Sequence, residues 1–343
     1  MDIRNIVIIS LVLLITGPAV AADAQLGRLV KDQQSNDNAA FKDRKIEQKD
    51  VFSDAVAKKE TDSTFPLETP CFQIDELVLS NDFLDDRGLN KIKKHVAGKC
   101  LGMNGLKKAA VLFQDYYINV GYITTRVEIP SQDLLTKKLS LAVIPGRISE
   151  IVIVDNDISK WVLPFSEGDI LNIRDVEQGL ENIQRTPEVD VKINIVPGTK
   201  NGTSKLVINT QRKKIWSARA SYNNYGDDST GNQLIGGVGY LYNVTSLSDV
   251  FYLAGTGSQT GGYKNASAYY SVPFGYTDLS LFYSKSKSTQ GIDVGIYTFD
   301  YVGETEYFSL KGNRMLYRNV NSKLSASAEL IRRKYDYTLG GTE

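Results

Sequence analysis

Alternation of apolar and polar residues constrains the fold of this chain more than any other feature, and it fills the tail from residue 215 to residue 343. The segments WSARASYN (216–223), LSLFYS (279–284) and KLSASAEL (323–330) carry apolar residues on one parity and mainly small polar or charged residues on the other. A period of two is the period of a β-strand. Turn-like clusters rich in glycine, asparagine and aspartate separate the segments, which predicts about eight strands.

These alternating segments fit a membrane β-barrel. Lipid offers no hydrogen-bond partner, so only a closed sheet satisfies the backbone groups of spanning strands. One parity then faces hydrocarbon, and the other faces an aqueous or plugged interior. A soluble antiparallel sandwich also alternates, but the segments here run to roughly ten residues, whereas soluble strands usually have about five or six. The polar parity is also rich in serine, glycine, asparagine and charge, which favours the barrel.

The amino terminus predicts export from the cytoplasm. An apolar run over residues 6–15 follows Arg4, and small residues lead up to Ala22. The run is shorter than the roughly 20 residues that a spanning helix needs. It has the order of a signal peptide, with cleavage expected after Ala21 or Ala22. We therefore expect residues 1–22 to be a signal peptide.

Export gives the two cysteines a role. We expect Cys71 and Cys100 to pair, because disulfides form in oxidising compartments. Closing a loop of about thirty residues contributes roughly 3 to 4 kcal/mol on the chain-entropy model. A metal site needs more ligands, and His95 is the only histidine. Lysine plus arginine and aspartate plus glutamate number 40 each, so no global charge points to nucleic acid.

Two successive blocks between the leader and the tail repeat one pattern of strand, helix and paired strands. In the first block, Asn104 is placed to cap a helix, and residues 122–129 read as a strand. In the second block, Asn172 caps a helix, and residues 189–195 alternate cleanly. Each block predicts a small α+β domain with helices on one face of a three-stranded sheet.

Short motifs in a fixed order make the chain resemble the two-partner secretion transporters, the haemolysin secretion and activation family of outer-membrane barrels. The motifs are CF (71–72) with GKCL (98–101), GYITTR (121–126), VIPGRI (143–148), LNIRDVEQGL (171–180), PG (197–198) with GTS (202–204), and YNNYG (222–226) with TG (230–231). Each motif is short, and their common order along the chain carries the resemblance.

The resemblance implies a signal peptide, then two α+β POTRA (polypeptide-transport-associated) domains followed by the N-terminal half of an antiparallel transmembrane β-barrel. Residues 23–70 would hold a polar plug-helix candidate and a linker. The POTRA domains would span 71–147 and 148–212, and the N-terminal part of the outer-membrane barrel 213–343. Barrels of this family have twice as many strands as this tail can supply, so we expect the chain to be a fragment or a truncated product.

The resemblance also implies a function. Such transporters capture an unfolded exoprotein at periplasmic POTRA domains and pass it through a barrel in outer-membrane lipid. The expected partner is a secreted haemolysin, adhesin or contact-dependent toxin. No cofactor, small-molecule substrate, nucleic acid or enzymatic activity is expected. Two alternatives stay open, namely a POTRA-barrel factor that assembles other outer-membrane proteins and a truncated periplasmic polypeptide-binding module without transport.

Capture is expected to add an extended client as a strand to a sheet edge beside a helix. The expected edge residues in the first POTRA domain are Tyr122, Thr124, Arg126 and Glu128. The expected groove residues on the facing helix are Phe113, Tyr116 and Tyr117. The helical spacing alone favours a core position for any single one of these three aromatic residues, and that alternative stays open.

Charged residues of the tail are expected to line the barrel lumen: Arg219, Lys285, Lys311, Arg314 and Glu329. Charged inner walls are normal for porin-like barrels, so these residues do not specify a client. The sequence PGR (145–147) predicts a tight turn between the two domains, with an ion pair from Arg147 as a further possibility. No residue is expected to be catalytic or to bind a metal.

Overall fold

The computed structural model describes residues 8–9, 64–84, 87–155, 157–294, 296–320 and 322–340. The predicted plug helix and almost all of the predicted signal peptide therefore lie outside the described residues. Within the signal-peptide range, only the two-residue strand β1 (Ile8–Ile9) is described, and it pairs with the last strand of the chain. Among the described helices, none is both long and apolar enough to cross a bilayer.

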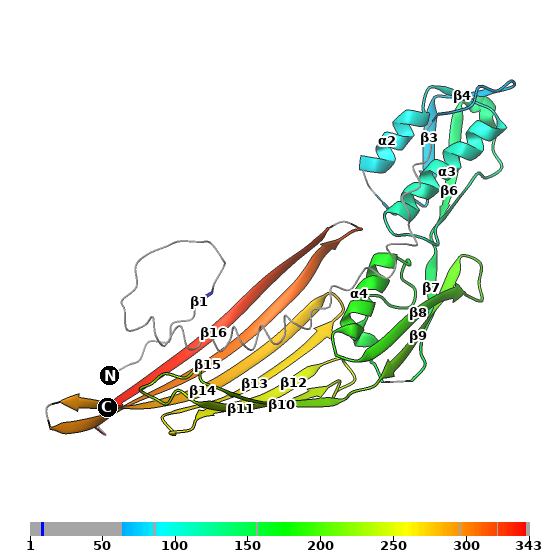
Figure 1. Cartoon of the computed structure of the whole chain (residues 1–343). Helices are drawn as coiled ribbons and strands as arrows, with labels where there is room; N and C mark the ends of the chain where they lie inside the picture. The colour runs from blue at the N-terminus through cyan, green and yellow to red at the C-terminus, as the bar shows by residue number, and fades with distance from the viewer. Residues whose placement is uncertain are drawn as a thin grey trace. The chain divides into compact units, whose positions relative to one another are not determined.

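The first α/β domain has two helices packed on a three-stranded sheet (Figure 1). Its sheet has the order β3-β6-β5, in which β3 is parallel and β5 antiparallel to the central β6. The aromatic and aliphatic core includes Phe113 and Leu141, both 0% exposed. The elements are β2 (Phe72–Ile74), β3 (Glu76–Ser80), α2 (Arg87–Val96), β4 (Lys99–Leu101), α3 (Met103–Asn119), β5 (Arg126–Glu128), η1 (Leu134–Thr136) and β6 (Lys138–Ile144).

The second α/β domain repeats this topology. Its sheet has the order β7-β9-β8, again with a parallel and an antiparallel partner for the central strand, and α4 packs against β8. The Asn172 side chain accepts a hydrogen bond from the Arg174 N–H at 2.9 Å, which confirms the predicted N-cap. The elements are β7 (Arg147–Ile153), η2 (Lys160–Val162), α4 (Ile173–Gln184), β8 (Val189–Pro197) and β9 (Thr203–Arg212).

The N-terminus of α3 corrects a prediction. Asn104 lies inside the helix, and the N-cap is Gly102, which has no side chain to offer. The carboxylate of Glu68 caps the helix instead. It accepts hydrogen bonds from the Asn104 N–H at 3.1 Å and the Gly105 N–H at 2.7 Å. The helix is thus capped from the preceding linker, which satisfies amide groups that its own residues leave open.

The tail forms one antiparallel sheet in which every strand pairs with the next in the chain (Figure 1). The tail contributes seven long strands rather than the roughly eight expected from the alternation. The strands are β10 (Trp216–Asn223), β11 (Leu234–Tyr242), β12 (Val250–Ser258), β13 (Tyr263–Phe274), β14 (Thr277–Val294), β15 (Tyr297–Arg318) and β16 (Lys323–Leu339).

The register sorts the side chains of this sheet into two faces, because directly paired residues point to the same side. One row crosses all seven strands through Trp216, Leu241, Phe251, Tyr270, Leu281, Leu310 and Leu330. The face that carries this row is the apolar face. The opposite, polar face carries Ser217, Ser271, Ser280 and Ser309. The two-faced strands predicted from the sequence are confirmed.

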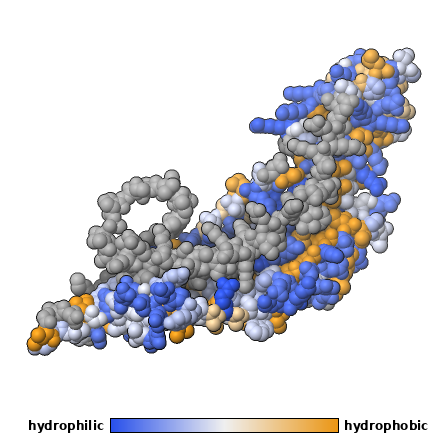
Figure 2. Space-filling view, viewed as in Figure 1, coloured by the Kyte–Doolittle hydropathy of each residue, from blue (hydrophilic) through white to orange (hydrophobic). Residues whose placement is uncertain are grey.

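The last three strands are much longer than a membrane requires. They have 18, 22 and 17 residues, whereas about 9 to 11 residues cross a bilayer. Lys285, the ninth residue of β14, pairs with Glu306 of β15 at 3.0 Å. At the tip of this hairpin, Ile296 is 91% exposed, and the same tip is hydrophobic at the lower left of Figure 2.

A β-bulge near the other end of β15 changes the direction of its final residues. The pairing with β16 shifts between Met315 and Tyr317, so Leu316 is an extra residue. Arg318 consequently pairs with Lys323 on the polar face. Without the extra residue, Arg318 would keep the even-numbered parity of the apolar face, since side chains alternate along a strand.

Candidate functional site: sheet edges, the inner wall and the domain joint

The predicted edge strand of the first domain is present but short. The strand expected over residues 122–129 is reduced to β5, because residues 122–125 form turns. Strand β5 lies at one end of its sheet, with the side chains of Arg126 and Glu128 exposed and Val127 buried. A sheet edge is therefore available in the first domain, although it spans only three residues.

This edge is already partly occupied. The Val127 N–H donates to Oε1 of Gln114 at 3.3 Å, and this donor therefore faces away from β6. Backbone groups alternate between the two sides of a strand, so the N–H groups of Arg126 and Glu128 point toward β6. A proline at either of these two positions would therefore damage the sheet itself rather than the free edge.

The predicted groove residues are mostly core residues. Phe113 and Tyr117 are 0% exposed, so they do not offer a surface to a client in this structure. The Tyr117 hydroxyl donates to Asp82 at 2.6 Å, and burial together with this contact raises the pKa of Tyr117. Tyr116 and Tyr122 are half-buried and pack against the same core. The core alternative left open by the helical spacing therefore describes Phe113 and Tyr117.

Thr124 lies at the joint between the two α/β domains rather than on a binding edge. A side chain at Gly146 would lie 2.0 Å from the Thr124 hydroxyl oxygen, so only glycine allows this approach. Close by, Gly121 accepts a hydrogen bond from the Ile173 N–H at the start of α4. The GYITTR motif (121–126) thus holds the first domain to the second.

Pro145 and Gly146 connect β6 to β7 without the predicted tight turn, and the role of the arginine that follows them is now defined. Arg147 Nη1 donates to the carbonyl oxygen of Gly168 at 2.7 Å. This contact replaces the ion pair that the sequence left as a possibility.

The second domain has a longer free edge, which the sequence analysis did not single out. Strand β8 has nine residues and ends its sheet, with no strand paired to its outer side in the part of the chain that the structure describes. The Gly198 N–H donates to Thr203 at 2.9 Å, and the Lys213 N–H donates to Glu188 at 3.0 Å. These two bonds show that the backbone groups at even-numbered positions of β8 point toward β9. The N–H groups of residues 189, 191, 193 and 195 therefore face the free edge.

The register places three of the five predicted lumen residues on the polar face and corrects two. Arg219, Lys311 and Glu329 lie on the polar face, and Lys311 is paired with Glu329. Lys285 and Arg314 lie on the apolar face. Lys285 lies in the middle of β14, opposite Ala266 of β13, and pairs with the carboxylate of Glu306. Arg314 lies near the opposite end, close to the turn between β15 and β16.

A buried charge network joins α4 to the end of β15. Arg318 donates two hydrogen bonds to the carboxylate of Glu181, from Nη1 at 2.7 Å and from Nη2 at 3.0 Å. Its Nε donates to Glu177 at 3.2 Å. Glu177 also pairs with Arg174, and Glu181 with Lys323. The side chains of Arg318, Glu177 and Arg174 are 3%, 2% and 6% exposed. Burial opposes ionisation of Glu181, but the bonds from Arg318 and Lys323 hold its pKa below the usual range.

Further polar contacts attach the second domain to the turn between β13 and β14. Asn182 Nδ2 donates to the carbonyl oxygen of Gly275 at 2.6 Å. The Tyr276 hydroxyl donates to Asp175. Burial nonetheless raises the pKa of the Asp175 carboxyl. Arg185 Nη2 donates to the Ser271 hydroxyl at 2.7 Å on the polar face. Helix α4 therefore lies against the polar side of the sheet, at the strand ends.

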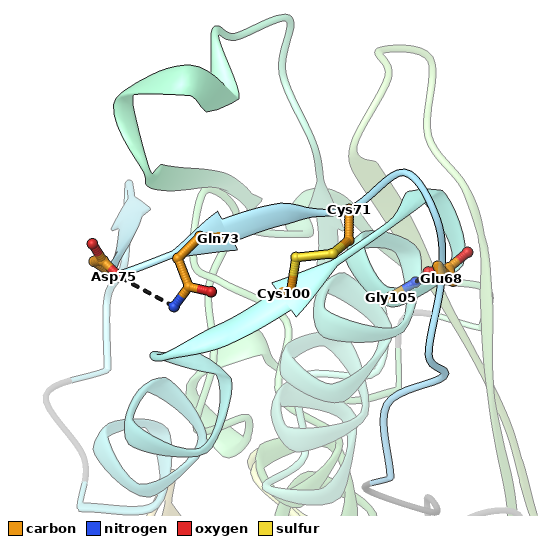
Figure 3. The surroundings of a disulfide bond; sticks show 6 residues. All are labelled: Glu68, Cys71, Gln73, Asp75, Cys100 and Gly105. Carbon is orange, nitrogen blue, oxygen red and sulfur yellow. Dashed lines mark hydrogen bonds between the residues drawn. A yellow bond between two sulfur atoms is a disulfide. The ribbon is translucent and has the colours of Figure 1, made fainter.

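The predicted disulfide is confirmed. Cys71 and Cys100 are bonded, with their Cα atoms 5.3 Å apart. Figure 3 shows the bond between the short strands β2 and β4, with Glu68 beside Gly105 at the start of α3. The bond and the Glu68 contact together fix the linker to the first domain. Among the described residues, no group of three or more histidine, cysteine, aspartate or glutamate side chains is arranged to hold a metal ion.

Family models match the three regions in order. Residues 72–146 match the POTRA domain of ShlB type, and residues 147–197 match a second POTRA domain model. Residues 202–343 match the haemolysin secretion/activation protein ShlB/FhaC/HecB model. Two POTRA domains followed by a wall of antiparallel strands define a POTRA-barrel protein of the outer membrane.

Curated relatives and solved structures narrow this class. Outer membrane transporter CdiB-2 of Burkholderia pseudomallei (strain 1026b) is 34% identical over 94% of this chain and 59% of the relative. Hemolysin transporter protein ShlB of Serratia marcescens is 28% identical over 69% of this chain and 43% of the relative. The structure of CdiB from Escherichia coli has a TM-score of 0.78 at 26% identity, covering 97% of this chain and 62% of that one.

Residues 202–343 form a domain of the haemolysin secretion/activation family, ShlB/FhaC/HecB, which follows two POTRA domains. The chain spans about half the length of the curated relatives that it matches, from 43% to 59% in the two cases above. Strands β10–β16 accordingly lie in the outer membrane, with the apolar face toward lipid, and the POTRA domains lie in the periplasm. The end of the sheet that contacts α4 is thus the periplasmic end.

Proposed function

We propose that this protein is the outer-membrane transporter of a two-partner secretion system. It would capture one unfolded exoprotein in the periplasm and pass it through the barrel. The names of its relatives support this proposal, since they include outer membrane transporters CdiB and hemolysin transporter ShlB. A haemolysin, an adhesin or a contact-dependent toxin is therefore the expected class of client, and neither a cofactor nor enzymatic chemistry is needed.

One structural observation carries the proposal. Helix α4 of the second POTRA domain is bound to the polar face of the barrel wall through Arg318, Arg185 and Asn182. A polypeptide held by this domain would consequently lie next to the lumen side of the strands. The same buried network gives the capture domain a fixed position at the barrel entrance, which shortens the path that an unfolded client must find.

We assign initial capture to the free edge of β8. Four outward N–H groups offer an extended client a row of main-chain hydrogen bonds, whereas β5 offers the Val127 N–H, which Gln114 already holds. Strand addition of this kind draws its affinity from main-chain bonds and is tolerant of client sequence. The exposed side chains of Arg126 and Glu128 can contribute a secondary contact in the first domain.

The transport proposal is tested by deleting the gene and comparing the proteins found outside the cell and in the outer membrane. Loss of one large exoprotein from the exterior, with outer-membrane proteins unchanged, is the expected result. A general loss of barrel proteins would instead indicate an assembly factor. No change in either set would indicate a periplasmic binding module without transport. Restoring the gene on a plasmid is the control.

A further inference from the structure

The loop before α4 carries a tryptophan that the proposed function does not use. Trp161, in η2, is 75% exposed. An indole ring combines a large apolar surface with one polar N–H, and this combination suits a boundary between apolar and aqueous surroundings. The side chain therefore calls for an explanation from its position in the fold.

The backbone around Trp161 runs along the periplasmic rim of the barrel wall. The Ser159 N–H donates to the carbonyl oxygen of Ser246 at 2.7 Å, in the turn between β11 and β12. The Gly275 N–H donates to the carbonyl oxygen of Trp161 at 3.2 Å, in the turn between β13 and β14. Two successive periplasmic turns thus hold this segment at the level where the strands leave the lipid.

The residues that follow Trp161 are buried against α4, whereas the indole of Trp161 is exposed. Its neighbours Val162 and Leu163 are 0% and 6% exposed, and Asn182 on α4 donates to the Val162 carbonyl oxygen at 2.8 Å. Helix α4 lies on the lumen side, because Arg185 contacts the polar face. The exposed indole of Trp161 is therefore not buried between α4 and the polar face.

Other aromatic residues mark the same level on the apolar face. Trp216 begins β10 and is 61% exposed, and Tyr317 ends β15 and is 54% exposed. Membrane barrels place aromatic girdles where the strands meet the headgroup layer, because indole and phenol rings prefer an environment that is half apolar and half wet. The backbone of Trp161 lies at the strand ends where such a girdle forms, although the residue belongs to a periplasmic domain.

We propose that Trp161 inserts into the headgroup layer of the periplasmic leaflet, so that the second POTRA domain contacts phospholipid directly. The partner is the phospholipid interface itself rather than an anionic headgroup. The ammonium group of the neighbouring Lys160 is paired with Glu167 at 2.8 Å, so it is not committed to a lipid phosphate. Insertion is therefore expected to depend little on anionic lipid or on salt.

The sequence offers a direct test, because it contains two tryptophans. Trp216→Phe leaves Trp161 as the single reporter, and Trp161→Phe leaves Trp216 as a lipid-facing control. Each variant is reconstituted in phosphatidylethanolamine and phosphatidylglycerol vesicles, with and without bromine on the upper acyl chain. We expect brominated lipid to quench the fluorescence of both reporters and iodide in the buffer to quench neither strongly.

Quenching of Trp161 by iodide but not by brominated lipid would overturn the inference, because the indole would then lie in water. Resistance to both quenchers would also overturn it, since protein would then cover the side chain. Vesicles of phosphatidylethanolamine and phosphatidylcholine, which lack anionic lipid, are expected to give the same bromine quenching. The quenching measurement needs no client protein. Its result therefore does not depend on whether the proposed transport is correct.

Discussion

At the scale of single residues, Arg318 is the side chain on which the attachment of the second POTRA domain depends most. Its guanidinium forms ion pairs with two carboxylates, and it is 3% exposed. Removing one partner of a buried ion pair is costly, because the remaining charges lose their compensation. When Arg318 is removed, Glu177 keeps Arg174 as a partner, but Glu181 loses the two hydrogen bonds from the guanidinium.

We therefore predict that Arg318→Ala lowers the free energy of unfolding of the second POTRA domain by about 3 kcal/mol or more. Urea titration in detergent, followed by the fluorescence of Trp161, measures this change. Lys285→Ala is the matched control, because it removes a cation from an ion pair whose lysine is 48% exposed. Such exposed pairs contribute at most about 1 kcal/mol. Equal stability of the two variants would contradict the assigned role.

Glu68 gives a second prediction at this scale, and it concerns pH. The Gly105 backbone N–H holds the pKa of the Glu68 carboxyl below its usual value of 4.5, against a smaller effect of desolvation. A lowered pKa in the folded state means that the stabilisation is present at neutral pH and is lost as the pH falls through the folded-state value.

Glu68→Gln should therefore destabilise the first POTRA domain at neutral pH, and the difference from the wild type should vanish in strong acid. Hydrogen exchange of the first turn of α3, compared between the two proteins at each pH, measures this. A difference that stays constant down to the acid limit would show that the carboxylate charge plays no part.

At the scale of elements, the bulge in β15 directs Arg318 toward α4. Deleting Leu316 should restore a regular register and turn residue 318 to the apolar face. Cysteines at positions 181 and 318, treated with a short bifunctional maleimide, report this directly, since the long side chains at these positions meet end to end in the wild-type arrangement. We predict a cross-link between them in the bulged protein and none in the Leu316 deletion. Cross-linking in both would mean that the bulge does not set the direction.

Elements whose signal is local could be predicted from the sequence. The period of two identified the tail strands, and Asn172 lies next to the helix that it caps. Other features depend on partners far along the chain. The cap of α3 comes from Glu68, and β5 is short because residues 122–125 turn toward the second domain. No local sequence pattern predicts either contact.

The misplaced lumen residues have a different cause. Lys285 shares the parity of Leu281, and Arg314 shares that of Leu310, so the alternation already placed both on the apolar face. Their charge suggested the lumen, but on the apolar face the charge of Lys285 is compensated by the carboxylate of Glu306 on the neighbouring strand. Arg318 is the converse case, since its orientation depends on a bulge that the sequence does not reveal.

At the scale of the whole molecule, three successive attachments connect the linker, the two POTRA domains and the barrel wall. The disulfide and Glu68 hold the linker to the first POTRA domain, and the glycine-rich joint holds the first domain to the second. The network around Arg318 then holds the second domain to the barrel wall. The free edge of β8 lies on the domain that is bound to the lumen side, so the proposed capture would take place next to the proposed passage.

The central claim is that an extended exoprotein adds to β8 before it enters the barrel. The most direct measurement is the amount of exoprotein outside a deletion strain that carries variants of this protein. Val191→Pro removes one N–H from the free edge, and Val191→Thr is a control of similar shape that keeps it. Lys192→Pro removes an N–H that bonds β9 and should disrupt the domain itself.

We predict wild-type secretion for Val191→Thr and at least a tenfold loss, about 1.4 kcal/mol, for Val191→Pro at an unchanged level in the outer membrane. Ile195→Pro, at the same free edge, serves as a second variant if the first does not reach the membrane. Wild-type secretion by a folded proline variant would contradict the account.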